Sequence, residues 1–240
     1  MPHTLFISDL HLSSDQSHSI AAFRHFIKDI APQADALYIL GDLFEYWAGD
    51  DDISDQFHAE VISALHELSA HGTKVFLMHG NRDLLMGQAM ARACQATLLD
   101  DPTELNLYGT PTLLSHGDIL CTDDVEYQRF RAQVHDAEFQ KKFLAQPISA
   151  RKDYIEQLRR LSTLEKQNKD IAIMDVNSAA VAGLLREYRY PRLIHGHTHR
   201  PDRHVHIVDG HSCERWVLGD WYQRGSALRC DVQGCHVLEF

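Results

Sequence analysis

The fold of this chain is set by the stretch TLFISDLH at residues 4–11. Its first five residues form an apolar run typical of a buried strand, and polar side chains follow where that strand ends. Two further runs, ALYIL at 36–40 and KVFLM at 74–78, are each followed within two residues by glycine. Between the runs, apolar residues recur at helical spacing over 20–30 and 57–68. This order predicts β-α-β-α-β, a largely parallel sheet with helices on both faces.

The remaining strands are predicted from short alternating patterns. Residues 105–108 and 112–115 flank Gly109, which is typical of a hairpin. Four more short strands are predicted in the last 40 residues, at 205–208, 216–218, 227–230 and 236–238.

Composition limits the kinds of protein this can be. The 240 residues include 23 Lys and Arg against 34 Asp and Glu, a formal charge of −11, which argues against nucleic-acid binding over the whole surface. No apolar run approaches the ~18 residues of a membrane span, and Met1 to His3 carry no basic residue of the kind that begins a signal peptide. The five cysteines form no CxxC pair, so we expect reduced thiols in a cytosolic protein. The 17 histidines suggest metal chemistry.

The segment of about 124–169 differs from the rest of the chain. Its pattern is helical, and residues 129–169 carry ten basic and five acidic side chains, a net +5 against −16 elsewhere. We therefore predict one domain spanning 1–240, with this segment inserted as a cationic helical cap. The alternative is that these charges are the solvated faces of ordinary helices.

Five short motifs stand where predicted strands end. They are DLH at 9–11, GDLFE at 41–45, GNRD at 80–83, HGD at 116–118 and GHTH at 196–199. The carboxyl ends of parallel strands meet at one edge of a sheet, where ligands bind. Glycine in these motifs allows the backbone to approach the site closely. Because the set offers oxygen and imidazole ligands and no thiolate, it favours manganese, iron or zinc.

This ordered set, from Asp9 to His199, resembles the calcineurin-like metallophosphoesterases. The resemblance implies a four-layer αββα sandwich with two metal ions above the sheet ends. It further implies that one ion is held by Asp9, His11, Asp42 and His199, and the other by Asp42, Asn81, His116 and His197, with Asp42 bridging.

The implied chemistry suits these residues. Two cations roughly 3.5–4 Å apart neutralise a phosphate ester and lower the pKa of bound water. A carboxylate such as Asp42 can offset both charges, and Asn81 adds an oxygen without further charge. The residues expected to carry catalysis are Asp42, Asn81, Arg82 and His116. Asp118 and His195 are candidates to orient the ligand imidazoles, with ordinary loop positions as the equal alternative.

Arg82 is a departure from the family pattern. Many members carry histidine after the asparagine, where it can protonate an alkoxide leaving group. Arginine stays protonated and grips a phosphate with two hydrogen bonds. Because a phosphate leaving group needs little protonation, Arg82 favours cleavage of a pyrophosphate bond over an alkyl monoester.

Longer strings narrow the resemblance within the family. They lie at 4–12, 36–45, 79–83, 115–124 and 193–201. They are similar to the branch that hydrolyses UDP-2,3-diacylglucosamine in lipid A biosynthesis. This implies that metal-activated water attacks the α-phosphorus, giving UMP and 2,3-diacylglucosamine 1-phosphate, with manganese as the usual metal.

The same resemblance implies substrate contacts. They fall on Asn81, Arg82, Asp124, Ser162, Lys166, Lys169 and His197, and Lys166 stands where a family member can carry asparagine. The apolar faces of the cap would form a cleft for acyl chains, leaving its basic residues for phosphates or the membrane. We expect reversible, peripheral attachment to the anionic cytoplasmic face of the inner membrane, at about 1 kcal/mol per basic residue near the surface.

Two other functions compete with this interpretation. One is another phosphoesterase of the same fold, such as a nucleotide phosphodiesterase or protein phosphatase. Arg82 and the cap argue against that function. The other is a non-catalytic binding module, which usually lacks some ligands, whereas all seven expected positions are intact here.

Overall fold

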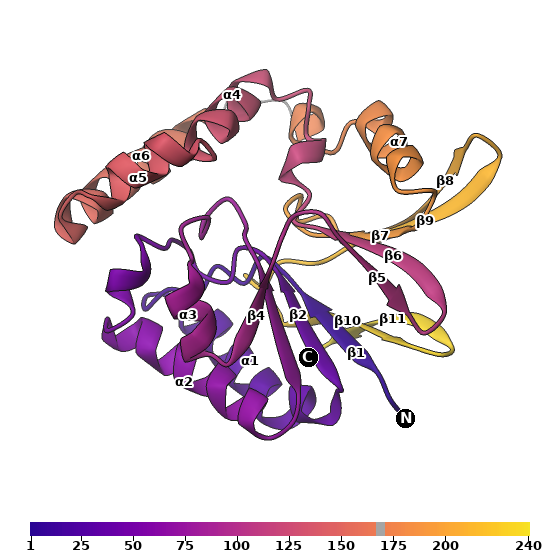
Figure 1. Cartoon of the computed structure of the whole chain (residues 1–240), viewed down its shortest axis with the longest axis horizontal. Coiled ribbons are helices and arrows are strands. Elements are labelled where there is room, and N and C mark those ends of the chain that lie inside the picture. Colours follow the sequence, from indigo (N-terminus) through magenta and orange to yellow (C-terminus); the bar gives the residue numbers. More distant parts are fainter. Residues whose placement is uncertain (167–170) are drawn as a thin grey trace.

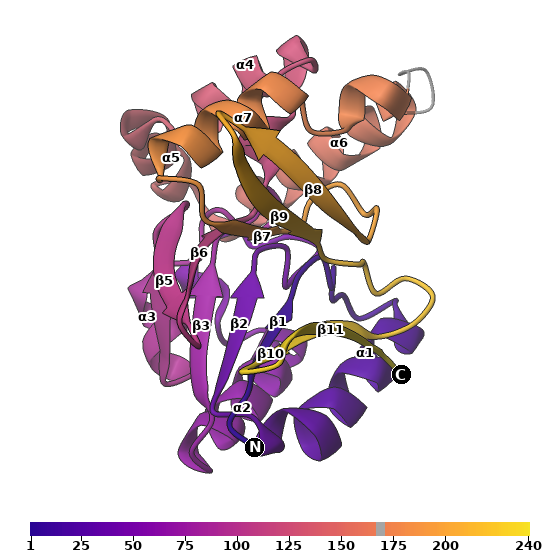
Figure 2. The same ribbon diagram turned by 90° about the vertical axis from the view of Figure 1, so that its right-hand side faces the viewer.

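The molecule is built from two facing β-sheets. The computed structural model describes the backbone of residues 1–166 and 171–240, and the side chains of residues 1–160 and 173–240. Helices cover the outer face of each sheet, so the layers run helix, sheet, sheet, helix (Figures 1 and 2). The αββα sandwich is thereby confirmed. The periodicity had predicted helices on both faces of one sheet, which was wrong because the later strands form a second sheet that covers the inner face.

The first sheet has the order β11-β10-β1-β2-β3-β4. Its parallel strands are β1 (Thr4–Ile7), β2 (Ala36–Leu40), β3 (Lys74–Met78) and β4 (Ala96–Leu99), and β10 (Ser226–Asp231) and β11 (Gly234–Glu239) extend it antiparallel. Thr4 pairs with Ala36, and Ala36 pairs with Lys74. The first three strands are therefore in step, and the residues that follow them meet at one edge.

Helices cover the outer face of this sheet. They are α1 (Ser17–His25), continued by a π-helical turn η1 (Phe26–Ile30), α2 (Gln56–Ala70) and α3 (Gln88–Ala93). Phe23, Phe26 and Leu65 lie in one buried cluster with Leu5 and Leu37 of the strands. Short α3 and β4 were not predicted, because six and four residues are too few to establish a period.

The second sheet has the order β5-β6-β7-β9-β8. Its strands are β5 (Thr103–Leu107), β6 (Thr110–Ser115), β7 (Arg192–His195), β8 (Asp202–Val208) and β9 (His211–Val217). Helix α7 (Ser178–Glu187) packs Val181 and Leu185 on its outer face. The short helical turns are η2 (Ala31–Gln33), η3 (Asp50–Asp52), η4 (Asp118–Leu120) and η5 (Ile171–Met174).

Three further helices lie beyond the strand ends of the sandwich. These cap helices are α4 (Val125–Val134), α5 (Ala137–Leu144) and α6 (Ile148–Lys166) (Figure 1). Helix α4 has no buried side chain, and Phe143 is the one that α5 buries. Arg151 of α6 is fully buried and bonds the Ala48 carbonyl and the Asp51 carboxylate, which ties the cap helices to the sandwich. Within the described part of the chain, no helix combines the length and apolarity that a membrane crossing requires.

Candidate metal centre

Backbone conformation marks the expected ligands. Five of the seven have left-handed φ values: Asp9 (56°), His11 (48°), Asp42 (52°), His197 (68°) and His199 (55°). Residues other than glycine adopt this region uncommonly, and such conformations cluster at functional sites where the surrounding structure enforces them. The backbone turns sharply after β1, β2 and β7 and points these side chains to one place.

Two glycines allow the loops to approach each other. A Cβ at Gly80 would lie 2.1 Å from Asp42 Oδ1, and one at Gly196 would lie 2.1 Å from Ser8 Oγ. No side chain fits at either position without displacing its neighbour. The expected close backbone approach is therefore confirmed at both motifs.

The two central carboxylates are oriented by backbone hydrogen bonds. The His197 amide donates to Asp9 Oδ2 (2.9 Å), and the Arg82 amide donates to Asp42 Oδ1 (2.8 Å). Each bond fixes one oxygen and turns the other toward the centre. Asp42 Oδ2 then lies 3.8 Å from His11 Nε2 and 3.9 Å from His116 Nε2, between the two halves of the site.

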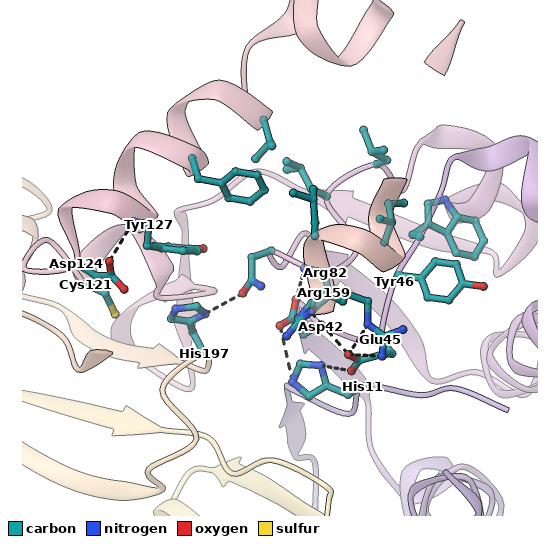
Figure 3. Close-up of a pocket in the computed structure, with 18 of the residues that line it drawn as sticks. His11, Asp42, Glu45, Tyr46, Arg82, Cys121, Asp124, Tyr127, Arg159 and His197 are labelled. Carbon is teal, nitrogen blue, oxygen red and sulfur yellow. Dashed lines mark hydrogen bonds and ion pairs between the residues drawn. The ribbon is translucent and has the colours of Figure 1, made fainter. Parts of the chain in front are cut away.

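The seven side chains form two neighbouring groups. Asp9, His11 and His199 lie close enough to one another to hold a cation, and so do Asp9, Asp42 and His116. Figure 3 shows His11 and Asp42 close together, with His197 to one side. In the first group, Asp9 Oδ1 lies 3.3 Å from His199 Nε2 and 4.0 Å from His11 Nε2, and the two imidazole nitrogens are 3.2 Å apart. In the second, Asn81 Oδ1 lies 3.1 Å from His116 Nε2 and 2.9 Å from His197 Nδ1. Donor atoms at this spacing can surround a cation in each group.

Unmatched buried acceptors indicate that cations belong here. Asp9 Oδ1 is buried and accepts no hydrogen bond among the described residues. Burial alone would lower the pKa of His116, but the charges of Asp42 and Asp9 raise it to about 9. The field that holds a proton on this imidazole also stabilises a bound cation. Carboxylate, amide and imidazole donors suit a divalent ion of borderline character, so the residues fit the metals that the resemblance implies.

The outer nitrogens of three imidazoles have partners that were not predicted. His11 Nδ1 lies 3.3 Å from Glu45 Oε2, His116 Nδ1 lies 2.9 Å from the Leu40 carbonyl, and His199 Nδ1 lies 3.6 Å from Asp220 Oδ2. Such partners fix the ring orientation of a metal-binding histidine. Glu45 ends the GDLFE motif and could have been found there, whereas Asp220 has no sequence signal.

Asp118 and His195 do not orient ligand imidazoles, so that prediction was wrong. Asp118 accepts from Tyr127 Oη (2.8 Å) and Arg131 Nε (2.7 Å). His195 contacts the Gly196 carbonyl through Nδ1 and Arg215 through Nε2. Both are buried, Asp118 in the helical turn after β6 and His195 at the end of β7, and each bonds these other groups instead of a ligand imidazole.

Asp83 holds two motifs together and was also missed. Its carboxylate accepts from the Gly80 and Leu43 amides, each at 2.8 Å. It therefore ties the loop after β3 to the loop after β2. Burial and the nearby charge of Asp42 raise the pKa of Asp83 to about 6.

Arg82 and Asp124, two of the expected substrate contacts, line the cavity beside the metal centre. Arg82 is partly exposed, and its Nη1 lies 3.7 Å from Glu45 Oε1. Asp124 is buried and caps α4 by accepting from the Tyr127 amide (3.1 Å), and it faces the same cavity (Figure 3). Ser162 and Lys166 have side chains outside the described residues, and Lys169 lies outside the described backbone.

A cavity of about 630 Å³ joins the centre to the cap helices. One end is lined by His11, Asp42, Asn81, Arg82, His197 and His199, and the other by Phe130, Val134, Phe139, Phe143, Ile155 and Leu158. The site therefore has a polar floor at the strand ends and an apolar wall supplied by the cap helices. The resemblance implied an apolar cleft of this kind at the cap, and the structure has one there.

Several basic residues of the cap helices are used inside the molecule. Arg131 bonds Asp118, Arg151 bonds Asp51, Lys152 bonds Asp52 and Arg159 bonds Glu45. These pairs attach the cap helices to the sandwich. Fewer cap charges face solvent than the +5 of the segment suggests.

Known proteins match this chain over nearly its full length. A family model described as calcineurin-like phosphoesterase matches residues 2–201. A protein of Aromatoleum aromaticum named UDP-2,3-diacylglucosamine hydrolase is 53% identical over 230 residues, 96% of this chain and 94% of its own length. Proteins of the same name from Xanthomonas axonopodis pv. citri and Edwardsiella ictaluri are 48% and 45% identical, covering 96% and 98% of this chain and 96% and 91% of their own lengths.

Two solved structures share the fold at low sequence identity. A novel archaeal phosphodiesterase is 12% identical, with a TM-score of 0.50 and 99% of both chains covered. A dimetal phosphatase from Danio rerio is 12% identical, with a TM-score of 0.50, covering 94% of this chain and 91% of its own. With the family model spanning most of the chain, the conclusion is that this protein belongs to the calcineurin-like phosphoesterases.

Proposed function

We propose that this chain is a metal-dependent hydrolase that splits the pyrophosphate bond of UDP-2,3-diacylglucosamine, a step of lipid A biosynthesis. The products are UMP and 2,3-diacylglucosamine 1-phosphate. The observation that carries the proposal is the single cavity that joins a cluster of cation ligands to an apolar wall. A substrate with a diphosphate and two acyl chains needs both surfaces side by side. The names of the full-length relatives support the same substrate.

The seven converging side chains are the proposed ligands of two divalent ions, with manganese as the preferred metal. Asp9, His11, Asp42 and His199 would hold one ion, and Asp42, Asn81, His116 and His197 the other. When bound, such ions neutralise phosphate charge and lower the pKa of water. Asp42 is the proposed shared ligand because its Oδ2 lies 3.8 Å from His11 Nε2 and 3.9 Å from His116 Nε2, one imidazole of each group.

Arg82 is proposed to grip the leaving phosphate. Arg82 lines the same cavity as the expected ligands, and its contact with Glu45 leaves some of its five N–H donors available for a phosphate. A leaving 1-phosphate needs charge stabilisation rather than a proton, which an arginine supplies. Asn81 and His197 are proposed to contact the substrate phosphate from the other side of the same floor.

The acyl chains are proposed to run along the cap wall. Asp124, at the start of α4, and Ser162, Lys166 and Lys169, further along the segment, are the proposed contacts to the sugar and its phosphate. In this proposal the chain is a single domain, with the segment of about 124–169 acting as its cap.

We also propose that the protein attaches to the anionic cytoplasmic face of the inner membrane. Arg129, Lys141 and Lys142 are exposed and form no ion pair among the described residues. Val125 and Phe130 are exposed beside them, at 54% and 37%. At about 1 kcal/mol per basic residue near the surface, attachment is reversible. Cosedimentation with anionic vesicles at low salt tests it, and equal recovery with neutral vesicles would contradict it.

Hydrolysis in ¹⁸O-labelled water tests the reaction most sharply. We expect mass spectrometry to find the label in UMP, because water attacks the α-phosphorus. Label in the sugar phosphate would overturn the site of attack. Faster turnover of cyclic nucleotides or phosphopeptides would favour another phosphoesterase of this fold. A folded protein that binds no divalent metal would favour a non-catalytic module.

A further inference from the structure

A second cavity adjoins the metal centre on the side of β8 and β9. Its volume is about 290 Å³, and it meets the first cavity at Thr198, which lines both. Arg200, His204 and Arg215 line it together with Asp175 and Asp202. Pro201 and Val217 also line it, so six of its eight lining residues are polar or charged, whereas the wall at the cap helices is apolar. Its volume lies near the lower limit of ligand pockets, roughly 300 Å³, which suits one compact polar group.

Arg215 is a buried cation with neutral partners. It is 6% exposed, and it bonds His206 Nε2 through Nε and His195 Nε2 through Nη1, each at 3.0 Å. Both partners are imidazoles rather than carboxylates. Among the described residues no ion pair joins the guanidinium to a carboxylate, although the charges of Asp175 and Asp202 act on it from farther away. A buried charge without a paired charge is costly, and an acceptor-rich ligand would relieve that cost.

Thr198 supplies a second unmatched group. Its Oγ1 is buried and has no hydrogen-bond partner among the described residues. Thr198 stands between His197 and His199 and lines both cavities. A ligand that spans the two cavities would therefore pass this residue.

We propose that the second cavity binds the nucleoside of the substrate's nucleotide half. The inference rests on the proposed function, in which the reacting phosphate lies over the centre and the two halves of the substrate leave it in different directions. The acyl half fits the apolar wall, so the nucleoside takes the polar cavity. Uracil carbonyl oxygens would accept from Arg215 and Thr198, and ribose hydroxyls would donate to Asp175 or Asp202.

Calorimetric titration of the manganese-loaded protein with UMP and with ribose 5-phosphate tests this subsite. Both probes carry the phosphate that the centre binds, and UMP alone carries the base. We expect UMP to bind more tightly than ribose 5-phosphate. In Thr198→Val and Arg215→Lys that advantage should fall about tenfold, the loss of one hydrogen bond to a charged or buried group, with ribose 5-phosphate binding unchanged.

Controls separate this role from a structural one. Arg203→Lys changes an exposed arginine of β8 outside the cavity and should leave both affinities unchanged. If Arg215 only supports the fold, its variant weakens both probes equally, and that result would overturn the proposal. An unchanged UMP advantage in folded Thr198→Val would overturn it too. If the wild-type protein fails to cleave UDP-2,3-diacylglucosamine, the proposed function fails, while the two titrations still decide whether a nucleoside subsite exists.

Discussion

The two ends of the main cavity are built in opposite ways. At the strand ends, the expected ligands are mostly buried, held in left-handed conformations and oriented by backbone amides. At the cap helices, the apolar lining side chains other than Phe143 are half-buried or exposed, and α4 buries none. The first arrangement fixes reacting groups before the substrate arrives, which is the requirement for electrostatic catalysis. The second supplies apolar area that can adjust to a flexible ligand.

Substitution of Asp42 should have the largest effect, because it acts at the most rigid point. Asp42→Asn keeps the shape but removes the charge shared by both groups. We expect a loss of several kcal/mol of transition-state stabilisation, which lowers kcat/KM about a thousandfold or more. The measurement is turnover together with metal content in metal-defined buffer, with exposed Asp29→Asn as control. Full activity in Asp42→Asn would contradict the proposal that Asp42 is a ligand of both ions.

Arg82 should have the next largest effect. Arg82→Ala removes the guanidinium but keeps the amide that orients Asp42. We expect a loss of about 2–4 kcal/mol in transition-state stabilisation with an unchanged melting temperature. An unchanged kcat/KM would remove the phosphate role of Arg82.

Glu45 should have an intermediate effect, because it acts through His11. Burial alone would raise the pKa of Glu45, but His11, 3.3 Å away, and the charge of Arg82 lower it to about 2, so it is ionised near neutral pH. Glu45→Gln keeps its size and removes that charge. Metal affinity or activity should fall about 10- to 100-fold. If manganese affinity stayed at the wild-type value, the orienting role would be wrong.

Metal affinity should depend on pH through His116. The pKa of this group is raised to about 9 in the metal-free protein, because Asp42 and Asp9 outweigh burial. At pH 7 the imidazole therefore carries a proton that a metal must displace. Affinity should rise about tenfold per pH unit from 7 to 9 and level off above that. Calorimetry in buffers of different ionisation enthalpy measures the released proton; a flat affinity with no release contradicts this.

The cap wall should give the smallest effect. Phe139 is half-buried, stacks on Phe143 and lines the apolar end of the cavity. In Phe139→Ala, kcat/KM for the diacyl substrate should fall by about 1–2 kcal/mol, mainly through KM, since part of one aromatic contact is lost. Hydrolysis of a soluble phosphodiester without acyl chains is the control. Equal losses for both substrates would mean that the wall supports the centre rather than the acyl chains.

The same contrast explains what could be predicted from the sequence. Strands β2 and β3 were predicted with their observed bounds, because short apolar runs that end at a glycine turn are a clear strand signal. The five motifs could be placed at one edge because parallel strands end together. Asp118 was misjudged because a sequence does not say which way a residue after a turn will point.

Long-range partners could not be predicted at all. Asp220, Tyr222 and Trp221 come from the loop between β9 and β10, and they reach the region around β1 only through tertiary structure. Tyr222 lies parallel to the His11 ring, with the ring centres 5.3 Å apart. The ion pairs of Arg151 and Arg159 likewise join segments about a hundred residues apart, so the charge pattern alone indicated a freer cationic surface than the fold provides.

Anomalous diffraction at the manganese edge, from crystals grown with that metal, would locate the ions themselves. We expect two peaks roughly 3.5–4 Å apart, one beside Asp9, His11 and His199, the other beside Asn81, His116 and His197, with Asp42 between them. A single peak away from Asp42, or none in a folded and active protein, would contradict this expectation.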